Sequence, residues 1–493
     1  MCVATCVVFV PVNRAEDRAN DVLARAKEKL REENLPKEAL ESLRPWSLDP
    51  GSDPDRIGEA VPLVVEALAR LNRINEADEY LEKTAAVHAR NGKVLHAVAM
   101  AYVSLQHFGH VIDNRFVRGN AGTGQWQDSR DRDRARALSL MRAAEKRFID
   151  GVDNRVADNS ADNSAAKPVA KRELGEFYLD FAACLLWQRE GNTAWRLQTT
   201  TDLESLPDYD AGNARFAGGT FAPVDSDGNP VCYTLPETFE SARSDGQRWR
   251  WCLDRAANAA PELLGETLFE RARFNDSQFG VETLRDYPTF FGYHSGEGAD
   301  TDDAGAVRDA LRALDTLTDD ETIAKLADGV KRFTLPGEFN PIALCKRIVD
   351  ENLTAREEAL TALAEIMENR RQFPRSAAYW RQLLEDYPTA VTAKRTQWRE
   401  RLDQIVKNRG TFEAVPSNVA GRGTDLRYRF RNGKNVVLSA REIKIPELIA
   451  DIKSYLRSLP KRTDWSRLRI DQIGYRLISD PENYGKYLGR EVA

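Results

Sequence analysis

The sequence predicts a mainly α-helical fold of stacked helical hairpins, an α-solenoid with loop insertions, followed by a small α/β segment that contains a β-hairpin. Three observations predict this fold. Apolar residues recur at helical spacing along most of the chain. One stretch repeats its apolar pattern after 34 residues. Beyond Gly410 apolar residues alternate with polar ones, as is typical of strands.

The composition indicates a folded, helix-rich protein and argues against several classes of partner. The 493 residues include 71 basic and 77 acidic ones, a formal net charge of -6, and 42% of all residues are hydrophobic. Without a broad basic field no nucleic-acid partner is expected, and the basic run Arg427–Lys434 is interpreted as a solvated strand face. No apolar run reaches the length of about 18 residues that a membrane span requires, so no transmembrane segment is expected.

The N-terminal segment, residues 1–20, is interpreted as the remnant of a secretion signal. It is apolar up to Val12, but no basic residue precedes the apolar stretch. Two localisations therefore stay open: export to the periplasm or cell envelope, or the cytoplasm if the N-terminus is native. Lipidation at Cys6 is not favoured, because Thr5 fits a lipoprotein cleavage site poorly.

Residues 21–150 are predicted to form the first helical repeats. The apolar positions that recur 34 residues later are Val61, Val64, Val65, Leu68 and Ile74, and their counterparts are Leu95, Val98, Ala99, Tyr102 and Phe108. This is the period of the tetratricopeptide repeat, a helix-turn-helix unit. Ala77 takes the position at which a small residue lets the second helix approach the first. The Gly-rich stretch 113–130 is interpreted as a loop inserted between two repeat helices.

The middle of the chain departs from the helical pattern in two places. A polar, low-complexity stretch at 151–170 is predicted to be a linker. Residues 171–300 are expected to form helices around a Gly- and Pro-rich insertion at 192–245. Within this insertion the sequence around Asp227-Gly228 predicts a hairpin.

Residues 301–410 are predicted to hold further tetratricopeptide-like helices, after an acidic loop at 295–305. Among the predicted helices are "VRDALRALDTL" and "ETIAKLADGVKRF", and Asn340-Pro341 is expected to begin another helix. The residues that match the repeat's apolar stripes, its turn and its small crossing position are Leu360, Leu363, Ala364, Met367, Phe373, Ser376, Trp380, Leu383 and Leu384. Phe373 is expected to close the turn between the two helices.

Residues 411–493 are predicted to form the small α/β segment. Two alternating runs, Leu426–Phe430 and Val436–Ala440, flank Asn432-Gly433, which is a strong hairpin signal. A helix is expected to follow in "IPELIADIKSYLRSL", and "IDQIGYRLI" is expected to be a strand.

No catalytic, cofactor-binding or metal-ligating residue is predicted, so the chain is not expected to be an enzyme and no cofactor is expected. His107, His110 and Asp113 are spaced three apart, which would place ligands on one face of a helical turn. A zinc site needs a further ligand, and half-buried helical histidines are the preferred interpretation.

Two other motifs also have structural interpretations. The run "DSDGN", Asp225–Asn229, is similar to the opening of a calcium loop, but it lacks the downstream glutamate and is interpreted as a tight turn. Trp249 and Trp251 alternate within a helical context, and core packing is preferred over a ligand groove.

The six cysteines form no Cys-x-x-Cys pair, which argues against a zinc cluster and against thioredoxin-like chemistry. Cys184 and Cys345 lie within apolar helical runs and are expected to be buried small hydrophobic residues. Cys232 and Cys252 would be able to pair in an exported protein, and the sequence leaves their state open.

Four segments resemble the amino-terminal region of bacterial, planctomycete-type alpha-2-macroglobulin-like proteins. They are "AWRLQTTTDLESLPDYD", "APVDSDGNPVCYTLPETFESARSDGQRWRW", "AGRGTDLRYRFRNGKNVVLSAREIKIPELIADIKSYL" and "IGYRLISDPENYGKYLGREVA". The resemblance implies an exported protein of the cell envelope that traps proteases, in which residues 411–493 lead into a macroglobulin-type β domain. The family's reactive thioester forms in a Cys-x-Glu-Gln motif, and none of the six cysteines is followed by x-Glu-Gln.

Three functions are weighed. The preferred one is a non-catalytic helical-repeat scaffold of such a protease-trapping protein, which binds a protein or peptide in the repeat groove and contacts the remaining macroglobulin domains. The alternative is a free-standing tetratricopeptide-type adaptor for protein–protein interaction. An enzyme with its site among the carboxylates of 192–245 is the least favoured.

Overall fold

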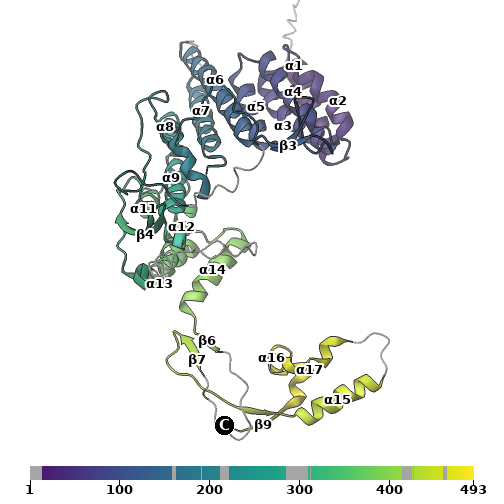
Figure 1. Ribbon diagram of the computed structural model, residues 1–493, viewed down its shortest axis with the longest axis vertical. Helices are drawn as coiled ribbons and strands as arrows, with labels where there is room; N and C mark the ends of the chain where they lie inside the picture. Colours follow the sequence, from purple (N-terminus) through teal and green to yellow (C-terminus); the bar gives the residue numbers. More distant parts are fainter. Residues whose placement is uncertain are drawn as a thin grey trace, which may run out of the picture. The chain divides into compact units, whose positions relative to one another are not determined.

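The computed structural model describes residues 14–157, 163–189, 191–210, 221–284, 309–310, 312–413, 425, 427–458 and 464–492. The chain divides into two compact units, Met1–Leu402 and Asp403–Ala493. The described residues are mainly helical with a few small antiparallel sheets, which confirms the helical class that the periodicity predicts (Figure 1). In the described part of the chain, no helix combines the length and apolar character needed to cross a membrane.

The first unit is built of helices, most of which pack against the next helix along the chain (Figure 1). The helices are α1 (Arg14–Arg31), α2 (Pro36–Ser47), α3 (Pro54–Arg70), α4 (Ala77–Val87), α5 (Gly92–Ser104), α6 (Arg130–Ala157), α7 (Asn163–Leu186), α8 (Asp245–Ala259), α9 (Leu264–Phe279), α11 (Pro341–Asp350), α12 (Arg356–Asn369), α13 (Phe373–Asp386) and α14 (Thr392–Val406), which continues into the second unit. Short 3-10 turns are η1 (Ile74–Glu76), η2 (Gly191–Gln198), η4 (Pro261–Leu263), η5 (Val281–Leu284) and η6 (Leu314–Thr316).

Four of the five recurring pairs fall on α3 and α5, two helices that pack against each other, whereas Ile74 lies in η1 and its counterpart Phe108 lies in β1. Val61 and Val64 on α3, and Val98, the counterpart of Val64, on α5, are fully buried. Ala77, the predicted small position, is also fully buried, at the first residue of α4. Apolar residues that recur after 34 positions are therefore buried on both helices.

The stretch predicted to be an inserted loop, 113–130, is instead part of a three-stranded antiparallel sheet. Its strands are β1 (Phe108–Ile112), β2 (Arg115–Arg118) and β3 (Gln125–Asp128), in the order β2-β1-β3. Its place between α5 and α6 agrees with the prediction. The sequence interpretation missed the tight turn at Asp113-Asn114, where φ is 48° and 60°, and this backbone joins two antiparallel strands with the correct twist.

The predicted linker, 151–170, is helical wherever the structure describes it. α6 continues to Ala157 and α7 begins at Asn163, so only 158–162 lies outside the described residues. The predicted acidic loop at 295–305 and residues 1–13 of the predicted signal remnant also lie outside them.

The segment "ETIAKLADGVKRF" was predicted to be a helix, and this prediction is wrong. It forms an antiparallel hairpin of β4 (Glu321–Leu326) and β5 (Gly329–Thr334). Gly329 adopts a φ of 127°, which only glycine tolerates easily, and a helix cannot contain it. The hydroxyl of Thr322 donates a hydrogen bond of 2.6 Å to the carbonyl of Phe279, which fixes the hairpin to the end of α9.

The best repeat match, α12 and α13, is a packed helical pair as predicted. Leu360, Leu383 and Trp380 are at most 1% exposed, and Ser376 at the crossing is fully buried. Phe373 was expected to close the turn, but it is the first residue of α13 and 37% exposed. The turn is instead made by Arg371, whose φ is 58°.

Asn340 begins α11 as the sequence predicts. Its side-chain oxygen accepts hydrogen bonds from the backbone N–H groups of Ile342 and Ala343, at 2.9 and 3.2 Å. Pro341 follows at the first helical position, where its missing N–H is not needed.

The second unit contains two two-stranded antiparallel sheets and short helices. Its elements are β6 (Arg409–Phe412), β7 (Tyr428–Arg431), β8 (Arg441–Ile443), α15 (Ile445–Arg457), η7 (Trp465–Leu468), η8 (Ile470–Gln472), α16 (Ile473–Ser479), α17 (Pro481–Tyr484), η9 (Gly485–Tyr487) and β9 (Leu488–Glu491). β6 pairs with β7, and β8 pairs with β9. The predicted strand "IDQIGYRLI" is wrong, because it forms η8 and α16.

The predicted hairpin at Asn432-Gly433 is also wrong. Asn432 has the expected positive φ of 61°, but its side-chain N–H groups donate to the carbonyls of Ile405 and Lys407 at the end of α14. The chain therefore turns back against α14, and β7 pairs with β6 instead of with Val436–Ala440.

Candidate functional site

An open pocket of about 750 Å³ lies among α7, α8 and α9, and is called the central pocket here. Its apolar lining is Leu179, Ala182, Ala183, Leu186, Trp187, Trp249 and Leu253. Its polar lining is Asp180, Gln188, Thr193, Glu266, Glu270 and Arg273. Three helices thus line one depression that is largely apolar with a few polar groups, which is the usual composition of ligand-binding sites.

Close helix packing makes the floor of the central pocket. Gly175 lets α7 approach the α8–α9 connection, because a Cβ there would lie 2.7 Å from that of Ala260 and 2.8 Å from a Leu263 methyl. Trp249 is only 1% exposed, and its ring centroid lies 4.8 Å from that of Phe274 on α9. Ser244 is the N-cap of α8, and its hydroxyl accepts a hydrogen bond from the backbone N–H of Gln247.

The charged side chains of the central pocket are mainly acidic. Asp180 Oδ2 lies 2.9 Å from His96 Nε2, and Glu270 forms an ion pair of 2.9 Å with Arg273. Glu266 accepts a hydrogen bond from the hydroxyl of Thr354. With three carboxylates and one guanidinium, the pocket has a negative excess that favours a basic ligand.

A second open pocket, of about 840 Å³, lies between α3, the end of α5 and strand β2, and is called the insertion pocket here. Its apolar lining is Pro62, Val65, Ala69, Ile74, Leu105, Val117 and Ala121. Its lining also includes the amide side chains of Asn72, Asn75, Gln106 and Asn120. The inserted sheet therefore forms one wall of a depression that the helices alone would leave open.

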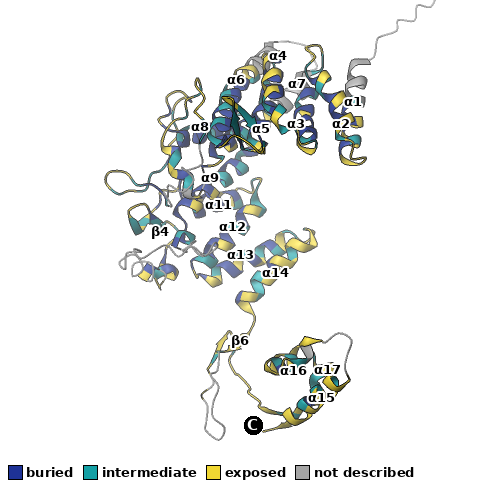
Figure 2. Cartoon of the chain, turned by 45° about the vertical axis from the view of Figure 1, so that its right-hand side comes forward, coloured by how far each residue is buried: buried dark blue, intermediate teal, exposed yellow. Residues whose placement is uncertain are grey.

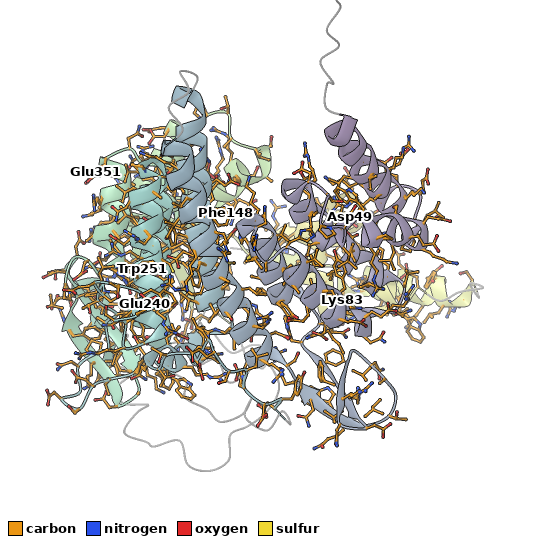
Figure 3. The ribbon with its side chains drawn as sticks, turned by 90° about the horizontal axis from the view of Figure 1, so that it is seen from above. Asp49, Lys83, Phe148, Glu240, Trp251 and Glu351 are labelled. Atoms are coloured by element: carbon orange, nitrogen blue, oxygen red, sulfur yellow. The ribbon has the colours of Figure 1, made fainter. Side chains whose placement is uncertain are left out.

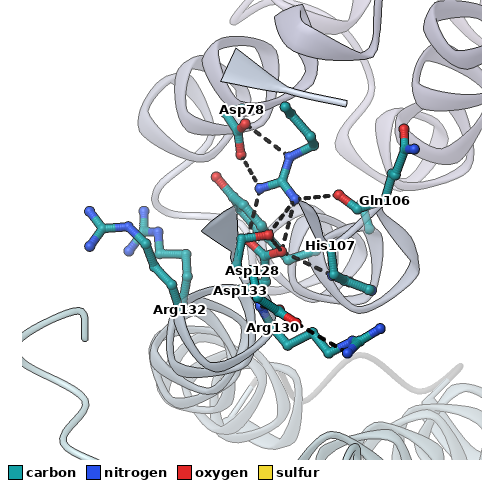
Figure 4. A network of polar contacts seen from close by, with 12 residues as sticks. Asp78, Gln106, His107, Asp128, Arg130, Arg132 and Asp133 are labelled. Atoms are coloured by element: carbon teal, nitrogen blue, oxygen red, sulfur yellow. Dashed lines mark hydrogen bonds and ion pairs between the residues drawn. The ribbon is translucent and has the colours of Figure 1, made fainter. Parts of the chain in front are cut away.

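Arg118 fixes the inserted sheet to the helices (Figure 4). Its guanidinium, 2% exposed, donates to both carboxylate oxygens of Asp78 on α4 and of Asp133 on α6, at 2.7 to 2.9 Å. It also donates to the carbonyl of Gln106 and the hydroxyl of Ser129. One side chain thus joins the insertion to α4, to α6 and to the segment that follows α5.

Electrostatics in this network favour the charged forms. Burial alone would lower the pKa of Arg118, but its hydrogen bonds with Asp133 and Asp78 outweigh burial and raise it. Burial likewise opposes ionisation of Asp133, yet hydrogen bonds from His107 and Arg118 lower the pKa of that carboxyl. The network is therefore an ionised, fully bonded cluster with a structural role.

A second buried pair connects the 192–245 insertion to the helices. Arg134 and Asp245, both 2% exposed, lie 3.0 Å apart. Arg134 also donates to the hydroxyl of Thr201 and to the carbonyl of Leu185, both at 2.6 Å. Burial lowers the pKa of Arg134, and the attraction of Asp245 opposes that effect.

The histidines singled out in the sequence do not converge. His107 Nδ1 lies 2.9 Å from Asp133, whereas His110 Nδ1 lies 3.1 Å from the carbonyl of Gly119. Asp113 occupies the β1–β2 turn, so these residues are not on one helical face. Within the described residues no three His, Cys, Asp or Glu side chains are grouped so as to hold a metal ion.

The calcium-like run Asp225–Asn229 is a tight turn. One carboxylate oxygen of Asp225 accepts from the backbone N–H groups of Asp227 and Asn229, at 2.9 and 2.8 Å. These hydrogen bonds, chiefly that from Asn229, lower the pKa of Asp225. Asp210, from the other carboxylate cluster of the enzyme alternative, pairs through its backbone with Asp128 of β3, away from this turn.

Both tryptophans pack in the core, as preferred. Trp251, labelled in Figure 3, has its ring centroid 5.7 Å from that of Tyr178 and 5.6 Å from that of Phe239. Trp249 in addition lines the central pocket, so it is both a core residue and part of a depression. Cys184, Cys232, Cys252 and Cys345 are free thiols, and all but Cys232 are buried.

Neither pocket could be predicted from the sequence, and neither could the Arg118 network. Periodicity identifies which face of each helix is buried, but not which helices leave a depression between them. Arg118 is one of many arginines in the sequence, and only the fold brings Asp78 and Asp133 to it across 40 and 15 residues.

Comparison with known proteins yields a structural likeness but no family. No protein-family model matches the chain, and no curated protein matches it. A solved structure described as "Assembly Chaperone of RpL4 (Acl4) (Residues 1-338)" aligns with 14% sequence identity. The alignment covers 78% of this chain and 97% of that chain, with a TM-score of 0.29.

Proposed function

We propose that the chain is a non-catalytic scaffold of tetratricopeptide-type helical hairpins that binds an extended segment of a partner protein. The observation that carries the proposal is the central pocket, where α7, α8 and α9 line one depression with an apolar floor. Stacked helical pairs present such surfaces because each pair buries its apolar stripe against the next and leaves the interhelical groove open.

The acidic lining defines the preferred partner segment. Asp180, Glu266 and Glu270 outnumber Arg273, so a segment with basic and apolar residues is expected to bind best. Salt is expected to weaken this binding, because charges at an open pocket are screened within about 10 Å at moderate ionic strength.

The test is a selection of peptides on the full chain, followed by affinity measurements on two variants. Ala183 is exposed on the floor of the central pocket, and Ala183→Trp would fill the pocket without entering the core. The matched control is Ala86→Trp, at an exposed position of α4 that does not line either pocket. Selected peptides should bind the control as they bind the wild type, and bind Ala183→Trp at least about tenfold more weakly.

Two outcomes would contradict the proposal. Selection on the folded chain could yield no peptide of basic and apolar residues with measurable affinity, or such peptides could bind Ala183→Trp unchanged. Hydrolysis or another chemical change of a selected peptide by purified chain would instead favour an enzyme.

The wider context proposed is that of a protease-trapping alpha-2-macroglobulin-like protein, exported to the cell envelope. It rests on the four resembling segments alone. Genomic sequence beyond residue 493 tests it, since the context requires a series of β-sandwich domains there. A reading frame without them would leave the free-standing adaptor as the function.

A further inference from the structure

The β6–β7 ribbon of the second unit has two chemically different faces. Arg409 pairs with Arg431 and Thr411 with Arg429, and side chains of directly paired residues lie on the same side of a sheet. The intervening pairs place Phe412, Tyr428 and Phe430 on the opposite side. These are called the basic face (Arg409, Thr411, Arg429, Arg431) and the aromatic face (Phe412, Tyr428, Phe430).

The aromatic face is largely exposed. Phe412 and Phe430 are 50% and 55% exposed, and β6 is exposed along its whole length (Figure 2). Tyr428 lies between them, with ring centroids 4.9 Å from Phe412 and 6.3 Å from Phe430. Its ring lies over Gly410, where any Cβ would collide with the phenol. Exposed aromatic clusters of this kind indicate an interaction surface.

The basic face lacks the carboxylates that would balance it. Among the described residues, Arg429 pairs with Glu413 at 2.8 Å, whereas Arg409 and Arg431 form no ion pair although they face each other directly. Like charges at a directly paired position destabilise a sheet. From Asp403 to Ala493 the sequence has 18 basic and 11 acidic residues, so the surroundings are also basic.

The ribbon also has open edges. Within the described residues its sheet has only two strands, and a strand at an edge exposes backbone N–H and C=O groups that an added strand can bind. A two-stranded sheet is marginally stable by itself, so a third strand would stabilise it.

We propose that this ribbon binds a partner protein by strand addition, and that the added strand alternates acidic and apolar residues. An added strand beside β6 or β7 continues both faces at once, so its acidic side chains lie next to the arginine of that edge, Arg409 or Arg431, while its apolar side chains lie next to Phe412 or Phe430. A nucleic-acid strand fits less well, because phosphates on the basic face would leave its bases on the wrong side of the sheet for the aromatic rings.

The experiment uses the full chain and a labelled seven-residue peptide of alternating Glu and Val, with fluorescence anisotropy as the readout. A peptide of the same composition with its Glu and Val residues in two blocks is the first control, and an alternating Lys and Val peptide is the second. The alternating acidic peptide should bind at least about tenfold more tightly than either control, and more weakly at high salt.

Two double variants separate the charge argument from loss of folding. Arg409→Glu with Arg431→Glu should reverse the preference, so that the Lys and Val peptide binds better, which an unfolded ribbon cannot do. The matched control, Lys453→Glu with Arg457→Glu, changes two exposed cations of α15 that form no ion pair among the described residues, and should keep the original preference.

Two further measurements test the backbone pairing and the class of the partner. Methylation of alternate peptide N–H groups should abolish binding, and equal binding of the methylated peptide would overturn strand addition. A single-stranded oligothymidylate or a vesicle of anionic lipid that binds more tightly than the alternating peptide would overturn the choice of partner. Because Ala183 of the central pocket is not involved, failure here leaves the proposed function of that pocket intact.

Discussion

Arg118 shows how one side chain determines where an insertion lies. Its guanidinium has five N–H groups in a planar fork, and the two carboxylates that it binds come from α4 and α6. A lysine at this position could not satisfy two carboxylates in the same plane. The sheet that forms one wall of the insertion pocket therefore depends on an arginine at residue 118.

We expect Arg118→Met to destabilise the first unit by about 3–5 kcal/mol, because it leaves the buried carboxylate of Asp133 without its main partner. Chemical denaturation followed by circular dichroism measures this. Arg115→Met is the control, since Arg115 is exposed on the same strand, and it should change stability by less than about 0.5 kcal/mol. Equal effects of both changes would mean that the network contributes nothing specific.

The thiols provide a second prediction at this scale. Burial raises the pKa of Cys232 to about 11, well above that of an ordinary thiol. Since the thiolate is the nucleophile, the alkylation rate of Cys232 in the folded chain should keep rising about tenfold per pH unit from pH 8 to pH 10. In denaturant the rate should level off above about pH 8.5. Peptide mapping by mass spectrometry follows this residue, and a plateau in the folded chain would contradict the prediction.

Individual residues were predictable from sequence where burial alone decides. Cys184, Cys345, Trp249 and Trp251 are all buried, as their apolar surroundings predict. Phe373 was not predictable in this way, because the turn before α13 is made by the positive φ of Arg371 and leaves the ring exposed. The backbone conformation of Arg371 therefore determines the exposure of Phe373 more than the hydrophobicity of the phenylalanine does.

At the scale of elements, the β4–β5 hairpin explains why periodicity failed. Its residues 322–324 are buried in succession, so neither strict alternation nor helical spacing describes them. Gly329 was the available signal, since glycine favours the left-handed backbone that the turn needs. The flanking residues also suit a helix, so this single glycine is a weak signal against the helical pattern.

We therefore expect Gly329→Ala to lower the free energy of unfolding of the first unit by about 1 kcal/mol, because alanine is strained at a φ of 127°. Gly337→Ala is the matched control, since Gly337 also has open space around a Cβ but not the strained backbone. It should be neutral or slightly stabilising. Denaturant titration compares the two, and a loss of stability in Gly337→Ala equal to that in Gly329→Ala would refute the role of the backbone.

At the scale of the molecule, the two units differ in how much apolar surface they bury. The buried cluster of the second unit consists of Leu448, Ile473 and Tyr487, whereas the clusters of the first unit extend through most of its helices. Large side chains such as Val437 and Ile478 are 93% and 84% exposed in the second unit. Since burial of apolar surface drives folding, the second unit is expected to open first.

Hydrogen exchange tests this expectation. Backbone amides of α15 should exchange at least about a hundredfold faster than those of α12, whose Leu360 and Leu363 are fully buried. Mass spectrometry of the full chain resolves both helices. Equal protection of α15 and α12 would show that more than the small buried cluster stabilises the second unit. In a separate measurement, addition of the alternating acidic peptide should slow hydrogen exchange in β6 and β7.

Stacking was predictable from the sequence, while the sites were not. The recurrence of Val61 and Val64 at Leu95 and Val98 marks two equivalent helices, and these are buried side by side. The central pocket is formed by α7, α8 and α9 together. No local sequence pattern indicates whether packed helices leave a depression between them. The contrast in charge between Asp403–Ala493 and the rest was visible in the sequence, but a net charge for the whole chain conceals it.

The β2–β3 connection has a practical consequence. Gly122 has a φ of 70° and no atom within 4 Å of where its Cβ would be, so an insertion here would meet open space and break only the local hydrogen bond from the Gly122 N–H to the Asn120 side chain. A fluorescent protein or an affinity tag spliced in at Gly122 would sit beside the insertion pocket while Arg118 continued to anchor the strand before it. Such a fusion would report on ligands at that end of the unit without touching either terminus.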